Sequence, residues 1–457
     1  ILLFLLLIVQ LSSLQTAAAQ DILGRWYSKV QLDTQEVHYL FDIRKNAATY
    51  AGYLDLPSIG NFRIPLDSVG FAGEQAVFSH NSLAMRFSGK LDPLKDEIAG
   101  YLTNDQRTYP LTLSRHPQAK RSQTIELPLS YQQEEVYFYN KDSIRFAGTL
   151  TLPRDVASPP VVVLISGSGP QNRDSEILGH KPFAVLADYL SRRGVAVLRY
   201  DDRGYGASQG QFRPATSKDY AFDALGAVQF LKNYPNKTFS KIGLAGHSEG
   251  GNIAPVVATM DSSVQFLILL AAPGTSNFYS YLVSLDLVLK DYPETYDRDF
   301  PFFKSVYEDM AYISDKATLK DSLQSKFERI AKLMAEEEFT IYGGKEGYIA
   351  SQVGYHTSDW YHYYLQFDMT DYLMQLDIPI LALNGNRDIS VEAIFNLNGI
   401  AQTLTKAGNQ QFETVILKDV NHFFQSSKDD KIESVYFNEE TFSKVALEKM
   451  IQWIRGL

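Results

Sequence analysis

Hydrophobic and polar positions alternate along the first part of the chain, between residues 21 and 115. Over short stretches every second residue is apolar, and turn residues such as Asp92-Pro93 and Asn104-Asp105 separate the stretches. A period of two is typical of strands that bury one face and expose the other. The expected strands are Ile22–Val30, Val37–Arg44, Thr49–Leu54, Phe62–Val69, Ala76–Phe78, Leu83–Leu91, Glu97–Thr103 and Thr108–Leu113. We therefore predict an all-β domain, a small barrel or a sandwich, over residues 21–115.

A short motif near the start of this domain, Gly24-Arg25-Trp26, resembles the opening Gly-x-Trp of lipocalin-like barrels. Two roles for the domain stay open at this point. It could bind substrate or shield an active site, or it could be a folding partner of the rest of the chain. Residues 116–134 are polar and carry two prolines, which predicts a linker.

From residue 135 the pattern changes to continuous apolar runs that alternate with amphipathic stretches. Two antiparallel strands come first, at Glu135–Tyr139 and Ile144–Leu152. The later expected strands are Pro160–Ser166, Val195–Tyr200, Lys241–Ala245, Phe266–Ala271, Ile378–Asn384 and Thr414–Leu417, and the expected helices are Lys181–Arg193, Ser217–Asn233, the stretch after Ser248 and Phe442–Arg455. Short apolar strands between helices indicate a mostly parallel sheet that helices cover on both faces. Its ligand site is expected at the carboxyl ends of the strands.

Residues from about 275 to 370 interrupt this alternation with three expected helices, Tyr279–Leu289, Phe303–Ile313 and Lys316–Ala335. A helical insertion between two strands of a parallel sheet is expected to form a lid over the strand ends. It closes with an aromatic stretch that begins at Trp360. This stretch could line a substrate pocket or anchor the lid to the core, so Trp360 is a candidate pocket residue.

The composition narrows the class of protein. The chain has 457 residues, of which 45% are apolar and 21% charged, as in a folded protein of two or three domains. A net charge of −10 argues against nucleic acid and anionic membrane as partners. There is no zinc-ligand spacing, and the absence of cysteine excludes disulfides. The oligomeric state stays open.

Residues 1–20 form an apolar run followed by small residues, with Ala17 and Ala19 where a signal peptide is cleaved. We expect a signal peptide, a mature chain that begins near Gln20 or Asp21, and an exported protein, either periplasmic or secreted. The run is too short for a comfortable transmembrane helix, and no other stretch approaches that length.

One motif has the local context that gives it a chemical meaning. The apolar run Ile242–Ala245 is followed by Gly246-His247-Ser248-Glu249-Gly250 and then by small residues suited to a helix. Gly-x-Ser-x-Gly between a strand and a helix is typical of a nucleophile elbow, a turn that strains the serine backbone. A Cβ at Gly246 or Gly250 would collide with neighbouring backbone. Ser248 is therefore the candidate nucleophile, and it needs a histidine base and an acid from elsewhere.

The loop after the strand at residues 160–166 contains Gly167, Ser168 and Gly169. In a sheet of this kind that loop supplies one backbone N–H of an oxyanion hole, and the residue after the nucleophile supplies the other. We assign these donors to Ser168 and Glu249, with the two glycines allowing the main chain to approach the substrate. The end of the loop adds two candidate pocket residues, Arg173 and Asp174. The Asp-Asp-Arg-Gly-Tyr-Gly motif at 201–206 is predicted to be structural.

Asp388 and His422 each come just after an expected strand. The order Ser, Asp, His along the chain is the one that this arrangement of sheet and helices uses for a catalytic triad. His247 is expected to point away from Ser248, and the other candidate histidines lie in the insertion. We therefore predict a triad of Ser248, Asp388 and His422.

The motifs of this region resemble those of the α/β-hydrolase superfamily and, within it, of bacterial serine esterases of the EstD type. They are Ser-Gly-Ser-Gly-Pro-x-x-Arg-Asp at 166–174, Asp-x-Arg-Gly-x-Gly-x-Ser at 201–208, Gly-His-Ser-Glu-Gly-Gly at 246–251, the aromatic stretch at 360–368, Leu-x-Gly-x-x-Asp at 383–388 and Asn-His-x-Phe at 421–424. The resemblance implies an α/β-hydrolase fold over residues 135–457 and hydrolysis of carboxylic esters with no metal or cofactor. The acyl and alcohol groups stay open.

Other activities share these residues. A serine peptidase or a thioesterase uses the same triad, and a binding protein with a decayed hydrolase domain is a further alternative. A peptidase would need carboxylates that grip a free amino terminus, and no segment marks such a pair. Export argues against coenzyme A thioesters, and the intact triad opposes a binding protein. We therefore predict a carboxylesterase that acts on a small-molecule ester.

Overall fold

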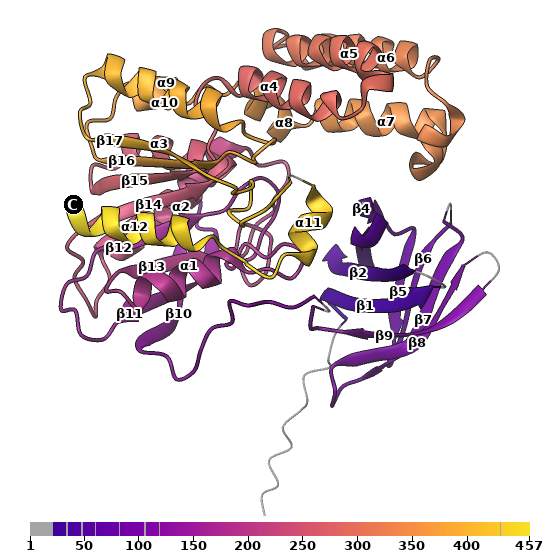
Figure 1. Ribbon diagram of the computed structural model, residues 1–457, viewed down its shortest axis with the longest axis horizontal. Helices are drawn as coiled ribbons and strands as arrows, with labels where there is room; N and C mark the ends of the chain where they lie inside the picture. The colour runs from indigo at the N-terminus through magenta and orange to yellow at the C-terminus, as the bar shows by residue number, and fades with distance from the viewer. Residues whose placement is uncertain are drawn as a thin grey trace, which may run out of the picture. The chain divides into compact units, whose positions relative to one another are not determined.

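Two compact units, residues 1–118 and 119–457, make up the chain, and each is built around its own β-sheet (Figure 1). The structure is a computed structural model that describes residues 22–457 apart from 33–34, 47–48, 60, 82, 105–106, 118 and 430. The signal peptide predicted for residues 1–20 lies outside the described residues. Its presence, and the export that it implies, stay predictions.

The first unit contains the predicted all-β domain, a sheet of nine antiparallel strands in the order β4-β3-β2-β1-β9-β8-β7-β6-β5. The strands are β1 (Gly24–Leu32), β2 (Gln35–Asn46), β3 (Thr49–Leu56), β4 (Asn61–Pro65), β5 (Ser68–Ala72), β6 (Gln75–His80), β7 (Met85–Asp92), β8 (Glu97–Asn104) and β9 (Arg107–Ser114), with a 3-10 turn at Pro57–Ile59. Strands that are neighbours in sequence are therefore neighbours in the sheet, except for β4 and β5, and β9 returns to pair with β1.

The two edge strands of this sheet, β4 and β5, follow one another in the chain. Leu66 and Asp67 alone connect them, and their N–H groups donate to Gly52 on β3 and to Ser79 on β6, both at 2.9 Å. Because so short a connection joins the two edges, the sheet must curl back on itself. The sequence predicted one strand at Phe62–Val69, and this is wrong. The strand that pairs with β3 ends at Pro65, and a second strand begins at Ser68 and pairs with β6.

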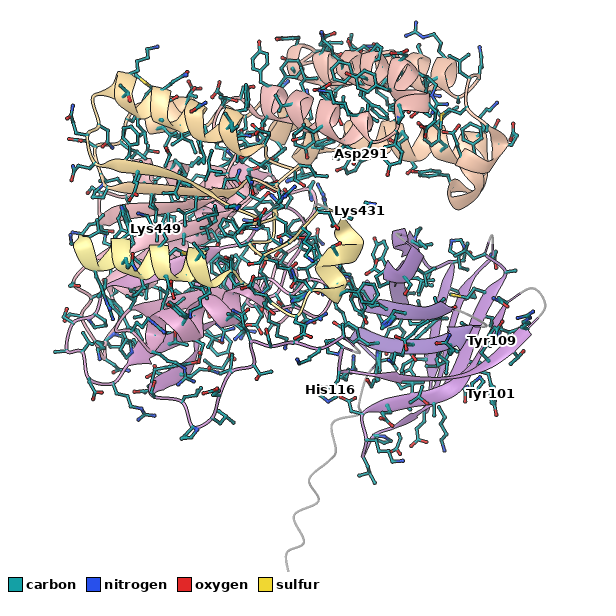
Figure 2. All side chains as sticks on the ribbon, viewed as in Figure 1. Tyr101, Tyr109, His116, Asp291, Lys431 and Lys449 are labelled. Carbon is teal, nitrogen blue, oxygen red and sulfur yellow. The ribbon has the colours of Figure 1, made fainter. Side chains whose placement is uncertain are left out.

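Large apolar side chains fill the inside of the curled sheet. Trp26, Phe41, Phe78 and Phe87 are completely buried, and the ring centroids of Phe41 and Phe78 lie 5.2 Å apart. The other face is polar or open to solvent, as at Tyr101 on β8, which is 61% exposed (Figure 2). The alternation in the sequence thus corresponds to an inward and an outward face.

The second unit has an eight-stranded sheet in the order β10-β11-β13-β12-β14-β15-β16-β17. The strands are β10 (Tyr131–Tyr139), β11 (Arg145–Pro153), β12 (Val161–Ile165), β13 (Ala196–Tyr200), β14 (Ile242–His247), β15 (Val264–Leu270), β16 (Ile380–Gly385) and β17 (Phe412–Leu417). The pairs of β10 with β11 and of β11 with β13 are antiparallel, whereas all pairs from β13 to β17 are parallel. The mostly parallel sheet predicted from the apolar runs is therefore present.

Helices cover both faces of this sheet. They are α1 (Pro182–Ser191), α2 (Ser217–Lys232), α3 (Glu249–Met260), α10 (Ala393–Ala407) and α12 (Lys444–Gly456), and the short helix α11 (Ile432–Phe437) precedes α12 in the chain. Buried side chains of α1 and α12 pack on one face, and those of α2, α3 and α10 pack on the other. This α/β-hydrolase fold brings the carboxyl ends of β12, β14, β16 and β17 to one edge of the sheet.

A run of helices lies between β15 and β16, at the place where the sequence predicted a helical insertion. They are α4 (Asn277–Lys290), α5 (Pro293–Tyr312), α6 (Lys316–Ile330), α7 (Lys345–His356), α8 (Asp359–Gln366) and α9 (Thr370–Leu373), with a 3-10 segment at Glu336–Tyr342. Their buried side chains are continuous with the core over α2 and α3. No helix among the described residues is both long and apolar enough to cross a membrane.

Part of the segment predicted as a linker is bound to the second unit. Ser122 N donates to Glu439 O at 2.9 Å, and the Gln123 amide donates to Phe442 O at 2.8 Å. The Gln123 side-chain oxygen accepts from the N–H groups of Thr441 and Phe442 at 2.7 and 2.8 Å. The stretch before β10 therefore runs along the segment that leads into α12.

Candidate active site

Ser248 lies on a strained turn between β14 and α3. Its φ of +54° and ψ of −119° place a residue with a Cβ in a region that side chains rarely occupy. Glycines on either side make the turn possible, because a Cβ on Gly246 would lie 2.0 Å from Gly250 O, and one on Gly250 would lie 2.3 Å from Ile165 O. Ser248 N donates to Leu270 O at 2.8 Å, which ties the turn to β15. The geometry is that of a nucleophile elbow.

Asp388 and His422 are joined by a hydrogen bond. His422 Nδ1 lies 2.8 Å from Asp388 Oδ2. The other oxygen, Oδ1, accepts from the N–H groups of Ser390 and Val391 at 2.9 and 2.8 Å. The Asp388 side chain is fully buried, whereas 14% of the His422 side chain is exposed. An aspartate held in this way fixes the orientation of the imidazole and leaves its other nitrogen, Nε2, to act as a base.

The residue before Ser248 connects the turn to the loop that carries His422. His247 Nε2 donates to the main-chain oxygen of His422 at 2.8 Å, and the two rings lie 4.9 Å apart between centroids. Burial, together with the charge of His422, lowers the pKa of His247 to about 3. Neutral His247 therefore ties the loop that carries His422 to the turn at Ser248 by a hydrogen bond. The sequence placed this side chain away from Ser248 but assigned it no contact.

The loop after β12 lies against Ser248. A Cβ on Gly167 would be 3.2 Å from Ser248 Cβ. Asp202 holds both ends of the loop, because its carboxylate accepts from Ser166 Oγ at 2.7 Å and from Gln171 N at 2.8 Å. Burial raises the pKa of this carboxyl to about 8. The motif at 201–206 thus orders the loop that carries Ser168, in line with the structural role expected for it.

Two of the three candidate pocket residues are engaged in ion pairs. Arg173 binds Asp201 at 2.8 Å and also contacts Glu135. Asp174 contacts the buried Arg199. Through these contacts both residues anchor the loop after β12. The sequence motif alone did not distinguish this structural role from a role in substrate binding.

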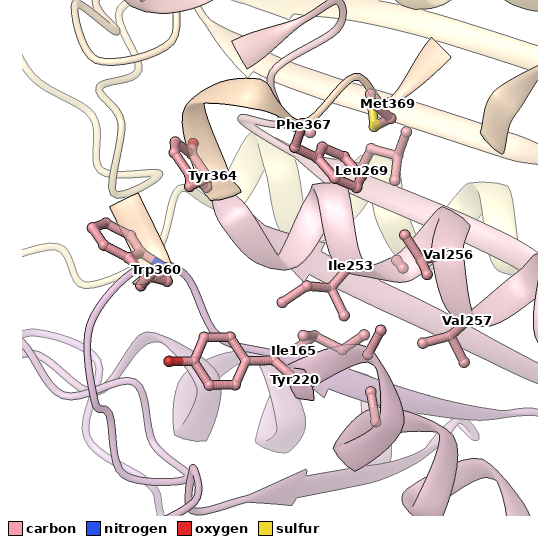
Figure 3. Packing of buried hydrophobic residues seen from close by; sticks show 14 of the residues in the cluster. Ile165, Tyr220, Ile253, Val256, Val257, Leu269, Trp360, Tyr364, Phe367 and Met369 are labelled. Atoms are coloured by element: carbon pink, nitrogen blue, oxygen red, sulfur yellow. The ribbon is translucent and has the colours of Figure 1, made fainter. Parts of the chain in front are cut away.

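Trp360, the third candidate, is buried and reaches the elbow. Its Nε1 donates to the Glu249 carboxylate, at 2.9 Å from Oε1 and 3.1 Å from Oε2. Figure 3 shows the indole beside Tyr364 of the same helix, in the buried cluster that also contains Tyr220 and Ile253. The Glu249 side chain was missed in the sequence analysis, which used only the N–H of this residue. A carboxylate in the Gly-His-Ser-Glu-Gly motif, next to a buried strand, was the available signal.

Metal ligands do not cluster in the part of the chain that the structure describes, where no group of three or more His, Asp or Glu side chains could hold an ion.

Comparisons with known proteins agree with the fold. A family model described as "Serine aminopeptidase, S33" matches residues 180–318. Esterase EstD of Thermotoga maritima is 23% identical over 311 residues, 67% of this chain and 65% of EstD. Thiohydrolase aneE of Aspergillus aculeatus is 33% identical over 135 residues, 29% of this chain and 40% of that protein. The chain thus spans less than two thirds of either relative.

Among solved structures, an esterase of Pyrococcus furiosus aligns with a TM-score of 0.45 at 15% identity, over 75% of this chain and 98% of that one. The resemblance predicted from the motifs is confirmed by the family model and by the match to EstD. The chain is similar to the α/β hydrolases and, among them, to the esterase EstD.

Proposed function

We propose that this protein hydrolyses carboxylic esters through an acyl-enzyme, with Ser248 as nucleophile, His422 as base and Asp388 as the acid that orients it. The observation that carries the proposal is the 2.8 Å hydrogen bond between His422 Nδ1 and Asp388 Oδ2, in a loop that His247 binds to the strained turn of Ser248. A serine hydroxyl becomes a nucleophile only when a base removes its proton. The His422–Asp388 pair supplies that base.

The reaction then follows in two halves. His422 Nε2 takes the Ser248 Oγ proton as Oγ attacks the ester carbonyl, and the same proton passes to the alcohol as the C–O bond breaks. A water molecule, deprotonated by His422, attacks the acyl-enzyme and releases the acid with regeneration of Ser248. The N–H groups of Ser168 and Glu249 hold the oxyanion in both halves, and one such donor contributes about 10²–10³ in rate.

The helices between β15 and β16 act as a lid in this proposal. They carry Trp360, which is buried and bonded to the residue after Ser248. A cover of this kind excludes water and shapes the pocket for the acyl or alcohol group. The aromatic side chains of α8 then serve both of the tasks that the sequence left open.

The relatives differ in the bond that their names imply. EstD is named an esterase, aneE a thiohydrolase, and the family model a serine aminopeptidase. We propose a small-molecule ester as the substrate class, because the match to EstD extends over 67% of this chain and the match to aneE over 29%. The mechanism draws on no cofactor. Matched nitrophenyl ester, nitrophenyl thioester and nitroanilide substrates with one acyl group separate the three possibilities.

The test combines a variant with a covalent probe. Ser248→Ala should lower kcat on the ester by about 10⁶, with the circular dichroism spectrum unchanged. A fluorophosphonate should label the wild-type chain once, at Ser248, and leave the variant unlabelled. Substantial esterase activity in Ser248→Ala would refute the assignment, and a preference for the anilide over the ester would make the protein a peptidase.

A further inference from the structure

The side chain of Glu249 is a buried carboxyl in the first turn of α3. Only 1% of the residue is exposed. Ser217 Oγ donates to Oε1 at 2.6 Å, and Trp360 Nε1 donates to both oxygens. Burial raises the pKa of this carboxyl, and the hydrogen bonds from Ser217 and Trp360 oppose the rise. The mechanism above uses none of these contacts.

The partners of this carboxyl come from separate parts of the second unit. Ser217 begins α2, and Trp360 belongs to α8 in the insertion. A buried carboxyl that loses its hydrogen bonds is strongly unfavourable. The carboxyl therefore favours the arrangement in which α2 and α8 both meet the elbow.

Trp360 is itself held on several sides. Its ring stacks with Tyr361 and Tyr364 of the same helix at centroid distances of 5.5 Å. The Arg213 guanidinium lies 4.5 Å from its ring centroid, in the range of a cation–π contact. An indole fixed in this way transmits any shift of α8 to the carboxyl that it binds.

We propose that Glu249 and Trp360 are positioning residues, whose hydrogen bond couples the docking of α8 to the geometry of the oxyanion hole. This inference rests on the proposed function. Glu249 supplies one oxyanion donor through its N–H, and its carboxyl is held by α2 and α8 through Ser217 and Trp360. The hole is complete only when α8 holds Trp360 on the carboxyl. A displacement of about 1 Å at a catalytic group costs on the order of 10² in rate.

Single substitutions test the coupling. Trp360→Phe removes the donor and keeps an aromatic ring, and Glu249→Gln keeps the backbone N–H while it replaces one acceptor oxygen by a donor. Both should lower kcat by about 10 to 100-fold on acetyl and octanoyl nitrophenyl esters alike, with KM changed by less than about two-fold. Each kcat is calculated from the concentration of active sites, which is determined by titration with a fluorophosphonate. Trp453→Phe is the matched control, because this indole belongs to α12 and packs on Phe266 of β15.

A double-mutant cycle measures whether one contact is responsible. If the two residues act through their shared hydrogen bond, the kcat of the double variant should be at most about twofold lower than that of the slower single variant. Additive losses would overturn the coupling. So would a higher KM that depends on acyl length with kcat unchanged, since that is the signature of a pocket wall.

A merely structural role predicts a lower melting temperature with kcat per titrated site unchanged, and this too would overturn the proposal. If Trp360→Phe does not fold, Ser217→Ala is the second variant, because it removes another donor to the same carboxyl. It should lower kcat per site by about 2 to 10-fold, and no change would count against the coupling. Failure of the proposed function is a different result, in which the wild-type chain takes up no fluorophosphonate.

Discussion

The two sheets of this protein differ in where the loops that follow their strands lie. In the antiparallel sheet consecutive strands pair with one another, except for β4 and β5. The loops that follow successive paired strands therefore leave from opposite ends of the sheet, and chemistry-bearing loops do not gather. In the second sheet β14, β16 and β17 are parallel, so the loops that follow them leave from one edge. Ser248, Asp388 and His422 come from those three loops. Parallel strands thus gather residues that are distant in sequence.

The interiors differ as well. Phe41, Phe78 and Phe87 fill the first unit and need no polar partner. Near Ser248 the carboxyls of Asp388, Asp202 and Glu249 each accept hydrogen bonds from more than one group, and those of Asp388 and Glu249 are buried. Burying a carboxylate is costly unless donors surround it, and those donors restrict the loops. Order at the site therefore depends on these hydrogen bonds, whereas the phenylalanine rings at the centre of the first unit are held by packing.

The largest effect is expected for Asp388→Asn, which tests whether the gathered residues act together. The amide cannot hold His422 as the carboxylate does, and kcat should fall by about 10⁴, as in other triads. Asp419→Asn is the control, because Asp419 follows β17 at the same edge but pairs with Arg387 at the surface. Rates on the ester substrate measure both. More than a tenth of wild-type activity in Asp388→Asn would break the triad assignment.

The second prediction concerns the core of the first unit. Trp26→Ala should lower the free energy of unfolding of this unit by about 3–5 kcal/mol, since it removes a fully buried ring that Arg115 covers at 3.6 Å. Urea unfolding followed by circular dichroism measures the loss, and Tyr101→Ala on the exposed face should change it by less than about 0.5 kcal/mol.

If chemistry resides only in the parallel sheet, Trp26→Ala should leave kcat per titrated site unchanged at temperatures where the variant is folded. A fall in kcat under those conditions would show that the first unit takes part in the reaction. That outcome would decide between the two roles left open for the domain.

The smallest effect is expected for His247→Phe, which removes the donor to His422 O. The loop that carries His422 then loses one hydrogen bond to the turn at Ser248. We expect kcat/KM to fall by about tenfold, which corresponds to the free energy of one hydrogen bond. His247→Gln, which keeps a donor, should recover part of the loss. Since the pKa of His247 is about 3, acidification from neutral pH to about 4 leaves His247 uncharged. The variant should therefore lose activity over the same pH range as the wild type.

Stability provides an independent check on His247. The unfolded chain takes up a proton at this histidine near its ordinary pKa of 6.5, whereas the folded chain resists until about 3. Between these values the unfolded state binds more protons, so this residue makes folding less favourable as the pH falls. Melting temperatures across that window should decline less steeply for His247→Phe than for the wild type. Parallel curves would contradict the low pKa.

Local patterns were enough to predict most elements of the fold. Period-two alternation found the strands of the first unit, and the apolar runs found β12 to β17. Where prediction failed, a long-range contact was decisive. The segment Phe62–Val69 has the composition of one strand, yet it is divided because β4 pairs with β3 and β5 with β6. Arg173 has the charge and the loop position expected of a residue that binds substrate, yet Asp201 holds it in an ion pair.

The amino-acid sequence alone determined the elbow at Ser248, the order of the three candidate catalytic residues and the two kinds of sheet, because glycine spacing and hydrophobic period act over a few residues. Only the tertiary structure decided that β4 and β5 form the two edges of the first sheet, that His247 anchors the loop of His422, and that the Glu249 carboxyl meets Trp360, 111 residues further along the chain. Such partners are chosen by how buried polar groups find donors after the chain has packed. No local pattern in the sequence records that choice.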